Sequence, residues 1–187
     1  MKTKIISDMT ESSQRFIDIL KPQLSKILKG SFITVEGETT DEMRKLFDIL
    51  SGIDAWFFNN AKGMRGIASR IQPSNHNWRT FTIRYKRDSG TKTEYEKRKY
   101  SIENNYLYPY LTLQSYLDDD NNIISYALIK TKDLISIVDN HLEKCILRKT
   151  GKSQIGQSSF VVVKWDLIIK LKFKILIYEN KELKIYN

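Results

Sequence analysis

Four polar side chains between residues 54 and 84 could act together on a phosphodiester. They are one carboxylate, one amide and two guanidinium groups, from Asp54, Gln72, Arg70 and Arg84. The period-2 alternation of a strand places Arg70 and Gln72 on one face, and the other two would join them if their strands present the same face. Guanidinium and amide groups contact phosphate oxygens, and a carboxylate can hold a metal ion beside them. The segment therefore predicts a surface that handles phosphodiesters.

These residues lie in three short runs that predict consecutive strands, over 53–58, 65–72 and 79–87. Each run mixes β-branched or aromatic residues with polar ones, and clusters containing Gly, Asn, Lys, Pro or His separate the runs. Because the connections are short, we expect the three strands to form an antiparallel meander.

Helical spacing of apolar residues predicts helices on both sides of these strands. The first helix runs from Asp8 to Gly30 with a kink or break at Pro22, and the second runs from Thr39 to Gly52. Two further helices are expected, over 91–104 and 132–147. The remaining predicted strands cover residues 32–35, 106–116, 123–129 and 160–165.

The chain of 187 residues predicts one α+β domain, in which helices flank a central mixed, largely antiparallel β-sheet. Residues 1–51 would form N-terminal helices and 52–165 the sheet core. Residues 166–187 alternate lysine with apolar side chains, which indicates an exposed strand or a peripheral tail. The single cysteine, Cys145, excludes an internal disulfide and fits a cytoplasmic setting. No stretch approaches the roughly 18 apolar residues of a membrane-spanning helix, so no membrane is expected as a partner.

The net charge of +9 is distributed unevenly along the chain. Residues 62–99 carry 11 basic and 3 acidic groups (+8), and residues 144–187 carry 10 and 3 (+7). The segment between them, 100–143, carries 2 and 7 (−5). Such segregation favours a polyanion-binding surface, since each phosphate that a cation neutralises releases counterions. A solvated lysine-rich surface is the alternative.

Aromatic residues alternate with cations in the segments 80–87 and 93–98, which is typical of groups that contact a phosphate backbone and stack on bases. Arg84 could instead form an ion pair with Glu94, or Arg87 with Glu96. Glu94 and Lys97, one helical turn apart, could also supply an alternative acid and cation to the site. The predicted nucleic-acid contacts are Arg65, Arg79, Arg84, Arg87 and Lys97.

The order of these elements resembles the PD-(D/E)XK nuclease superfamily, which has the restriction-endonuclease-like fold. The strand that begins near Asp54 resembles the one that bears the superfamily's metal-binding aspartate, and residues 66–72 take the place of its acid-x-lysine strand. The earlier glutamate of the superfamily falls on Glu36, Glu38 or Glu42. The resemblance covers about residues 10–165 in element order and a few motif positions.

The resemblance implies Mg²⁺ or Mn²⁺ held by Asp54 and Glu36. Arg70 would stabilise charge on the phosphorane, and Gln72 would assist as a neutral oxygen ligand. The chain departs from the superfamily's pattern, because either Ala68-Ser69-Arg70 or Arg70-Ile71-Gln72 stands where acid-x-lysine is expected, and a guanidinium is not readily deprotonated. Either Glu36 or Glu38 completes the metal shell, or the fold acts as a binding module without catalysis. An ion pair between Asp54 and Arg70 would be purely structural.

These observations favour a nucleic-acid-binding, nuclease-like protein of a phage or mobile element, acting on DNA, with Mg²⁺-dependent phosphodiester hydrolysis if the site is complete. One alternative is a non-catalytic DNA-binding or regulatory module of the same fold. Another is a phage or mobile-element protein that docks on an acidic protein partner. A homodimer is compatible with each of them.

Overall fold

The computed structural model describes residues 14–35, 42, 52–61, 63–74, 76–150 and 157–187. Their strands form two sheets, a large sheet in the order β1-β2-β3-β5-β6-β9-β10 and a small sheet in the order β4-β8-β7. The large sheet contains β1 (Ser31–Thr34), β2 (Ala55–Asn59), β3 (Gly63–Pro73), β5 (Leu111–Leu117), β6 (Ile123–Lys130), β9 (Ile175–Glu179) and β10 (Glu182–Tyr186). The small sheet contains β4 (Thr80–Arg87), β7 (Ile146–Lys149) and β8 (Ser158–Lys164). The helices are η1 (Phe16–Leu20), α2 (Lys21–Leu28), α5 (Glu94–Glu103), α6 (Thr131–Asn140), η3 (Leu142–Lys144) and α7 (Trp165–Lys170).

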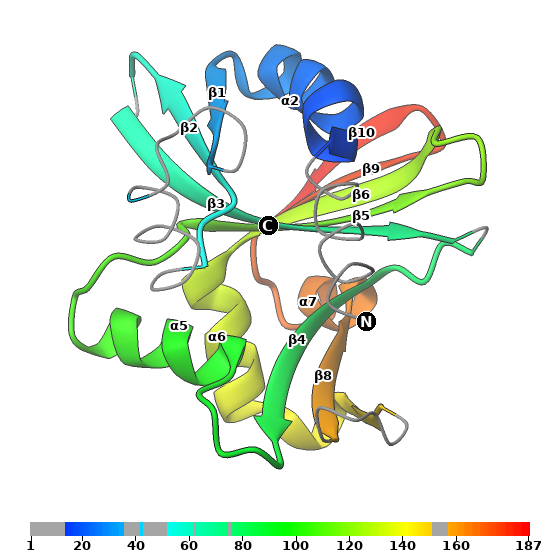
Figure 1. Ribbon diagram of the computed structural model, residues 1–187. Coiled ribbons are helices and arrows are strands. Elements are labelled where there is room, and N and C mark those ends of the chain that lie inside the picture. Colours follow the sequence, from blue (N-terminus) through cyan, green and yellow to red (C-terminus); the bar gives the residue numbers. More distant parts are fainter. Residues whose placement is uncertain (1–13, 36–41, 43–51, 62, 75, 151–156) are drawn as a thin grey trace.

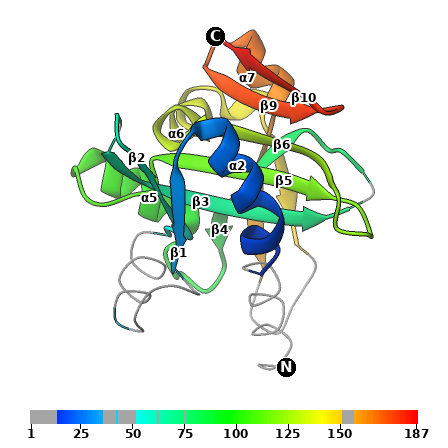
Figure 2. The same cartoon turned by 90° about the horizontal axis from the view of Figure 1, so that it is seen from above.

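The predicted class is confirmed: the protein is α+β, with a mixed sheet flanked by helices. In Figure 1 the large sheet is seen nearly edge-on, with α2 above it and α5, α6, α7 and the small sheet below. Turned by 90°, the structure shows α2 lying across the strands (Figure 2). The two faces of the large sheet are therefore covered by different layers.

One core lies between the N-terminal helix and the large sheet. Phe16, Leu20 and Leu24 recur at helical spacing and are all buried against that sheet. The helix changes from π to α geometry at Lys21, next to Pro22, where the sequence predicted a kink or break. It ends with Lys29 in the left-handed conformation, one residue before the predicted Gly30. The second predicted helix, Thr39 to Gly52, falls mostly outside the described residues.

The larger core lies between the other face of the large sheet, α6 and the small sheet. Alternation in β4 and β8 sends Phe81, Ile83, Val161 and Val163 into this core, where Trp165 at the start of α7 is also fully buried. The opposite face of the small sheet is thereby left free of this core.

The expected meander of three strands is wrong. β2 and β3 form an antiparallel hairpin, but β3 then pairs in parallel with β5, and β4 leaves to pair with β8 in the small sheet. The reason is non-local: the apolar face of β4 packs against that of β8, about 80 residues later in the chain. The short loops in the sequence could not reveal that β4 would pair with β8 instead of β3.

The helix predicted over 91–104 is confirmed as α5. Thr93 is its N-cap and forms a capping box with Glu96, in which the Thr93 side chain accepts from the Glu96 amide and the Glu96 side chain accepts from the Thr93 amide. The following strand begins at Leu111, later than the expected 106, and Pro109 precedes it.

Two expectations for the C-terminal part are corrected. The helix predicted over 132–147 ends at Asn140, and Ile146, within the predicted range, lies instead on the exposed strand β7. Residues 166–187 are not a peripheral tail throughout, because β9 pairs with β6 inside the large sheet and buries Ile175 and Ile177. Within residues 166–187, β10 is the exposed edge strand. Alternation of lysine with apolar residues predicts a strand, but whether that strand is internal or at the edge of a sheet depends on the strands that pair with it.

Candidate functional site

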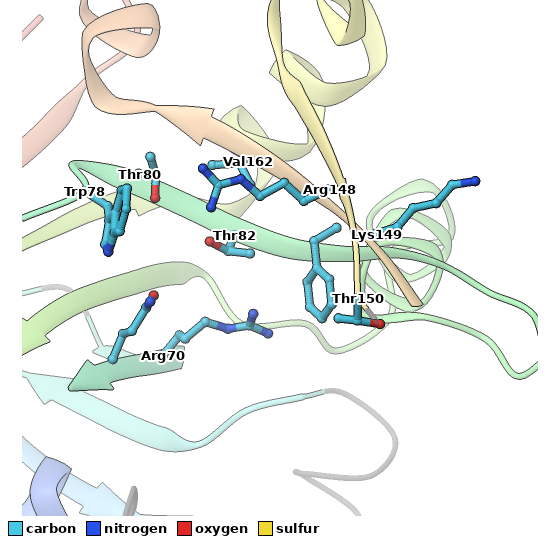
Figure 3. Close-up of a pocket in the computed structure, with 10 residues that line it drawn as sticks. Arg70, Trp78, Thr80, Thr82, Arg148, Lys149, Thr150 and Val162 are labelled. Carbon is cyan, nitrogen blue, oxygen red and sulfur yellow. The ribbon is translucent and has the colours of Figure 1, made fainter. Parts of the chain in front are cut away.

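A pocket of about 370 Å³ lies between β3 of the large sheet and the outward face of the small sheet. Figure 3 shows Arg70 rising from β3 toward the side chains of the small sheet. The residues that line the pocket are Arg70, Gln72, Trp78, Thr80, Thr82, Arg148, Lys149, Thr150, Phe160 and Val162.

Strand alternation explains why these residue types line the pocket. On β4, Phe81 and Ile83 face the core, so Thr80 and Thr82 between them face outward. On β3, Arg70 and Gln72 share one face, as the period of two predicts, and both line the pocket. A polar surface on each sheet therefore faces a polar surface on the other.

Positive charge dominates this pocket. Arg70 and Arg148 extend into it from opposite walls, whereas Lys149 points away from its centre (Figure 3). None of the ten described residues that line the pocket carries a carboxylate. Within the described part of the chain, no carboxylate forms an ion pair with Arg148 or Lys149. The pocket is thus suited to an anionic ligand.

Trp78 adds an aromatic surface to the same pocket. Its side chain is 46% exposed, although a tryptophan is usually well buried. The indole Nε1 donates a hydrogen bond to Ser74 Oγ at 3.2 Å, and the ring lies 5.5 Å from that of His76. The Arg148 guanidinium lies 5.7 Å from the centre of the Trp78 ring. The ring is held in place while much of its surface stays accessible.

Beside the pocket, Glu94 contacts three arginines, two through their side chains and one through its backbone amide. The Glu94 carboxylate accepts a hydrogen bond from Arg70 Nη2 at 3.0 Å and forms an ion pair with Arg98 Nη2 at 2.7 Å. The backbone amide of Arg84 donates to the same carboxylate at 3.3 Å. The guanidinium groups of Arg70 and Arg84 lie 5.7 Å and 5.4 Å from the centre of the Phe160 ring. Glu94 and Phe160 together fix the position of Arg70 at the pocket wall.

The charges of this cluster are reflected in two pKa shifts. Burial by itself raises the pKa of Glu94, but the Arg98 and Arg70 guanidinium groups and the Arg84 amide outweigh it, so this pKa is lowered. Burial, with the positive charges of Arg87 and Arg70, lowers the pKa of Arg84. Glu94 is therefore ionised at neutral pH, and one carboxylate is shared among several cations.

Asp54, the predicted catalytic and metal-binding acid, lies immediately before β2, is half-buried and does not line the pocket. Its Oδ2 accepts a hydrogen bond from the Ser69 amide at 2.5 Å, and its own amide donates to the Ile67 carbonyl at 2.9 Å. This carboxylate extends the β2–β3 ladder by one side-chain contact. The structure thus brings Arg70, Gln72 and Arg84 together around the pocket and Glu94, and places Asp54 on the neighbouring backbone.

The structure describes only some of the residues that were predicted to bind a divalent metal ion. Glu36 and Glu38 lie outside the described residues, and Glu42 is exposed. Among the described residues, no group of three His, Cys, Asp or Glu side chains could hold a metal ion. The described residues therefore supply one of the two carboxylates that the resemblance implies, and that one already binds a backbone amide.

The other predicted nucleic-acid contacts are scattered. Arg79 forms ion pairs with Glu179 and Asp166, and these pairs join the β3–β4 connection to β9 and α7. The Arg65 guanidinium lies 4.1 Å from the centre of the Tyr110 ring. Arg87 is at the end of β4, and Lys97 is on α5, so neither is among the residues that line the pocket.

Sequence reasoning missed Trp78, Arg148 and Phe160 as site residues. Arg148 was missed because residues 132–147 were expected to form one helix, whereas residues 146–149 form β7. A tryptophan in a polar loop between two strands was the available signal for Trp78, because such a ring has little to pack against.

Comparison with known proteins gave no match to any family model, curated protein or solved structure. None of the helices in the described ranges is long and apolar enough to cross a membrane.

Proposed function

We propose that this protein binds nucleic acid in the pocket between its two sheets. The observation that carries the proposal is the pocket's composition: two inward arginines, an accessible tryptophan and, among its described lining residues, no carboxylate. Cations of this kind bind phosphates with release of counterions, and an exposed ring can stack on a base. DNA is the expected partner, in keeping with the basic segments of the sequence.

Trp78 favours nucleic acid over an acidic protein partner. Both partners would satisfy Arg70 and Arg148, but the carboxylates of a protein offer no flat ring to an accessible indole. The position of Trp78 beside Arg148 supplies neighbouring contacts for a base and a phosphate. A basic patch that docks on acidic protein surfaces has no need of this arrangement.

The proposal concerns binding, because the residues that carry it line the pocket and Asp54 does not. Asp54 accepts a hydrogen bond from the Ser69 amide and lies outside the pocket lining, and the described residues do not complete a magnesium site around it. The pocket, by contrast, supplies Arg70 and Arg148 as cations that would contact phosphates. A binding module of this kind is the function that the geometry supports best.

The test is fluorescence anisotropy with labelled DNA over a range of salt concentrations. We expect wild-type affinity to fall steeply as salt rises, and Arg148→Glu to weaken binding about tenfold or more and to reduce the slope of log K against log salt by about one. Lys170→Glu makes the same change in net charge on an exposed residue of α7 outside the pocket lining, and should have a small effect. Absence of wild-type binding at low salt, or equal losses in the two variants, would contradict the proposal.

A further inference from the structure

We infer that the pocket accepts one unstacked nucleotide of a single strand, with its base against Trp78 and its phosphate on Arg148. This inference rests on the proposed function. It adds that the nucleic acid is single-stranded, that the pocket holds one nucleotide, and that Trp78 is the residue that distinguishes a base from a bare phosphate. Three observations lead to it: the size of the pocket, the way Trp78 is held, and the hydrogen-bonding groups on the pocket walls.

The pocket is of the size that takes a small ligand. At about 370 Å³ it lies at the lower end of the range for small-molecule sites, which matches one nucleotide rather than a helix of paired bases. In a duplex the faces of each base are covered by its neighbours in the stack. A base can reach Trp78 within the pocket only if it leaves that stack, which costs least in a single strand.

Trp78 is positioned for stacking before any ligand arrives. Its hydrogen bond to Ser74 and its contact with His76 fix the ring, yet 46% of the side chain stays exposed. Phe160, the other aromatic residue of the pocket, is half-buried and has two guanidinium groups near its ring, those of Arg70 and Arg84, whereas the more exposed Trp78 has one, that of Arg148. Trp78 is consequently the aromatic side chain of the pocket that is best placed to receive a base.

Both walls of the pocket offer hydrogen bonds to the edge of that base. Gln72 extends from β3 into the pocket, and its amide can both donate and accept. Thr82 adds a hydroxyl from β4, whereas the hydroxyl of Thr80 is already hydrogen-bonded to Tyr116 at 2.8 Å. Arg148, 5.7 Å from the centre of the Trp78 ring, is near enough to bind the phosphate of a nucleotide stacked there.

Tryptophan fluorescence gives a direct test. Trp56 and Trp165 are 6% and 0% exposed, so Trp78 is the accessible one of the three tryptophans. We expect single-stranded oligo(dT) of about 12 nucleotides to quench the emission and a duplex of equal length to quench it much less. Trp78→Leu should abolish the quenching and weaken single-strand affinity about tenfold, while Trp78→Phe should restore most of the affinity.

Tyr100→Leu is the matched control, because Tyr100 is an aromatic residue of α5 with 48% exposure and does not line the pocket. It should leave affinity and quenching unchanged. The salt slope separates stacking from charge: Trp78→Leu should keep the wild-type slope, whereas Arg148→Glu lowers it.

The outcomes distinguish this inference from the proposed function. If wild-type protein binds neither single-stranded nor duplex DNA, both fail. If Arg148→Glu weakens binding but duplex binds as tightly as single strand, and Trp78→Leu changes neither quenching nor affinity, the protein binds the phosphate backbone alone and the single-nucleotide inference is overturned.

Discussion

Asp54 and Glu94 are two partly buried carboxylates in neighbouring parts of the molecule, and the structure uses them in different ways. Asp54 accepts a backbone amide of β3 and helps to hold two strands together. Glu94 binds the side chains of Arg70 and Arg98 and the amide of Arg84, so that α5, β3 and β4 meet at one carboxylate. The sequence predicted that Asp54 would be the central acid of the site, whereas in the structure Glu94 is the acid that forms ion pairs with Arg70 and Arg98.

The difference shows what a residue's type can and cannot reveal. An aspartate just before a strand has a backbone amide within reach, and a short side chain favours that local bond. A glutamate in the first turn of a helix has a longer side chain, and it can reach cations on other elements while its charge also suits the helix dipole. The contrast between these two acids can be tested by removing each in turn.

Removing Glu94 should have the largest effect on stability. Glu94→Ala leaves the Arg98 side chain, only 6% exposed, without its carboxylate, and we expect the free energy of unfolding to fall by about 3 kcal/mol. Urea denaturation measures the change. Glu103→Ala is the control on the same helix, since its exposed contact with Lys99 at 3.9 Å should contribute less than about 0.5 kcal/mol. Similar losses in the two variants would show that Glu94 is no more than a surface acid.

The contribution of Glu94 should also depend on pH. Its pKa in the folded protein is lowered from the ordinary value of 4.5, so the unfolded chain binds a proton more readily over the interval between the two values. The stabilisation is therefore complete above about pH 4.5 and is lost as pH falls through the lower, folded pKa. The pH dependence is measured as the difference in free energy of unfolding between wild type and Glu94→Ala at pH 7 and at successively lower pH. A difference between the two proteins that stays constant into acid would rule this out.

Changes at Asp54 should be smaller and should depend on hydrogen bonding rather than on charge. Asp54→Ala leaves the half-buried Ser69 amide without its acceptor, which costs about 1 kcal/mol. Asp54→Asn keeps an oxygen at the same position and should lose less. If the asparagine variant is as unstable as the alanine variant, the carboxylate's charge matters more than its contact with β3.

The same pair of variants examines the nuclease hypothesis. We expect neither wild type nor Asp54→Asn to cleave DNA in Mg²⁺ or Mn²⁺, and we expect both to bind it equally. Cleavage by wild type that disappears in Asp54→Asn would instead support a metal-dependent nuclease, with Glu36 as the expected second ligand.

The sequence allowed local features of the fold to be predicted, because they depend on neighbours in the chain. The β2–β3 hairpin followed from its turn residues, α5 from its helix formers, and the shared face of Arg70 and Gln72 from strand alternation. These patterns are set within a few residues and need no knowledge of the partner strand.

Features set by distant partners could not be predicted in this way. The parallel pairing of β3 with β5, the departure of β4 to β8 and the internal position of β9 all join segments far apart in the chain. The candidate site was missed for the same reason: Arg148 and Trp78 are neighbours only because β7 and the β3–β4 connection meet across the pocket.

The walls of the pocket come from four separate stretches of chain, within 70–72, 78–82, 148–150 and 160–162. Closing loops of this length has an entropic cost that tertiary packing offsets, so we expect the cavity to form together with the packing of the two sheets. Occupancy is thereby linked to the global unfolding equilibrium. A saturating ligand should raise the melting temperature of the whole domain and slow amide exchange in both sheets together.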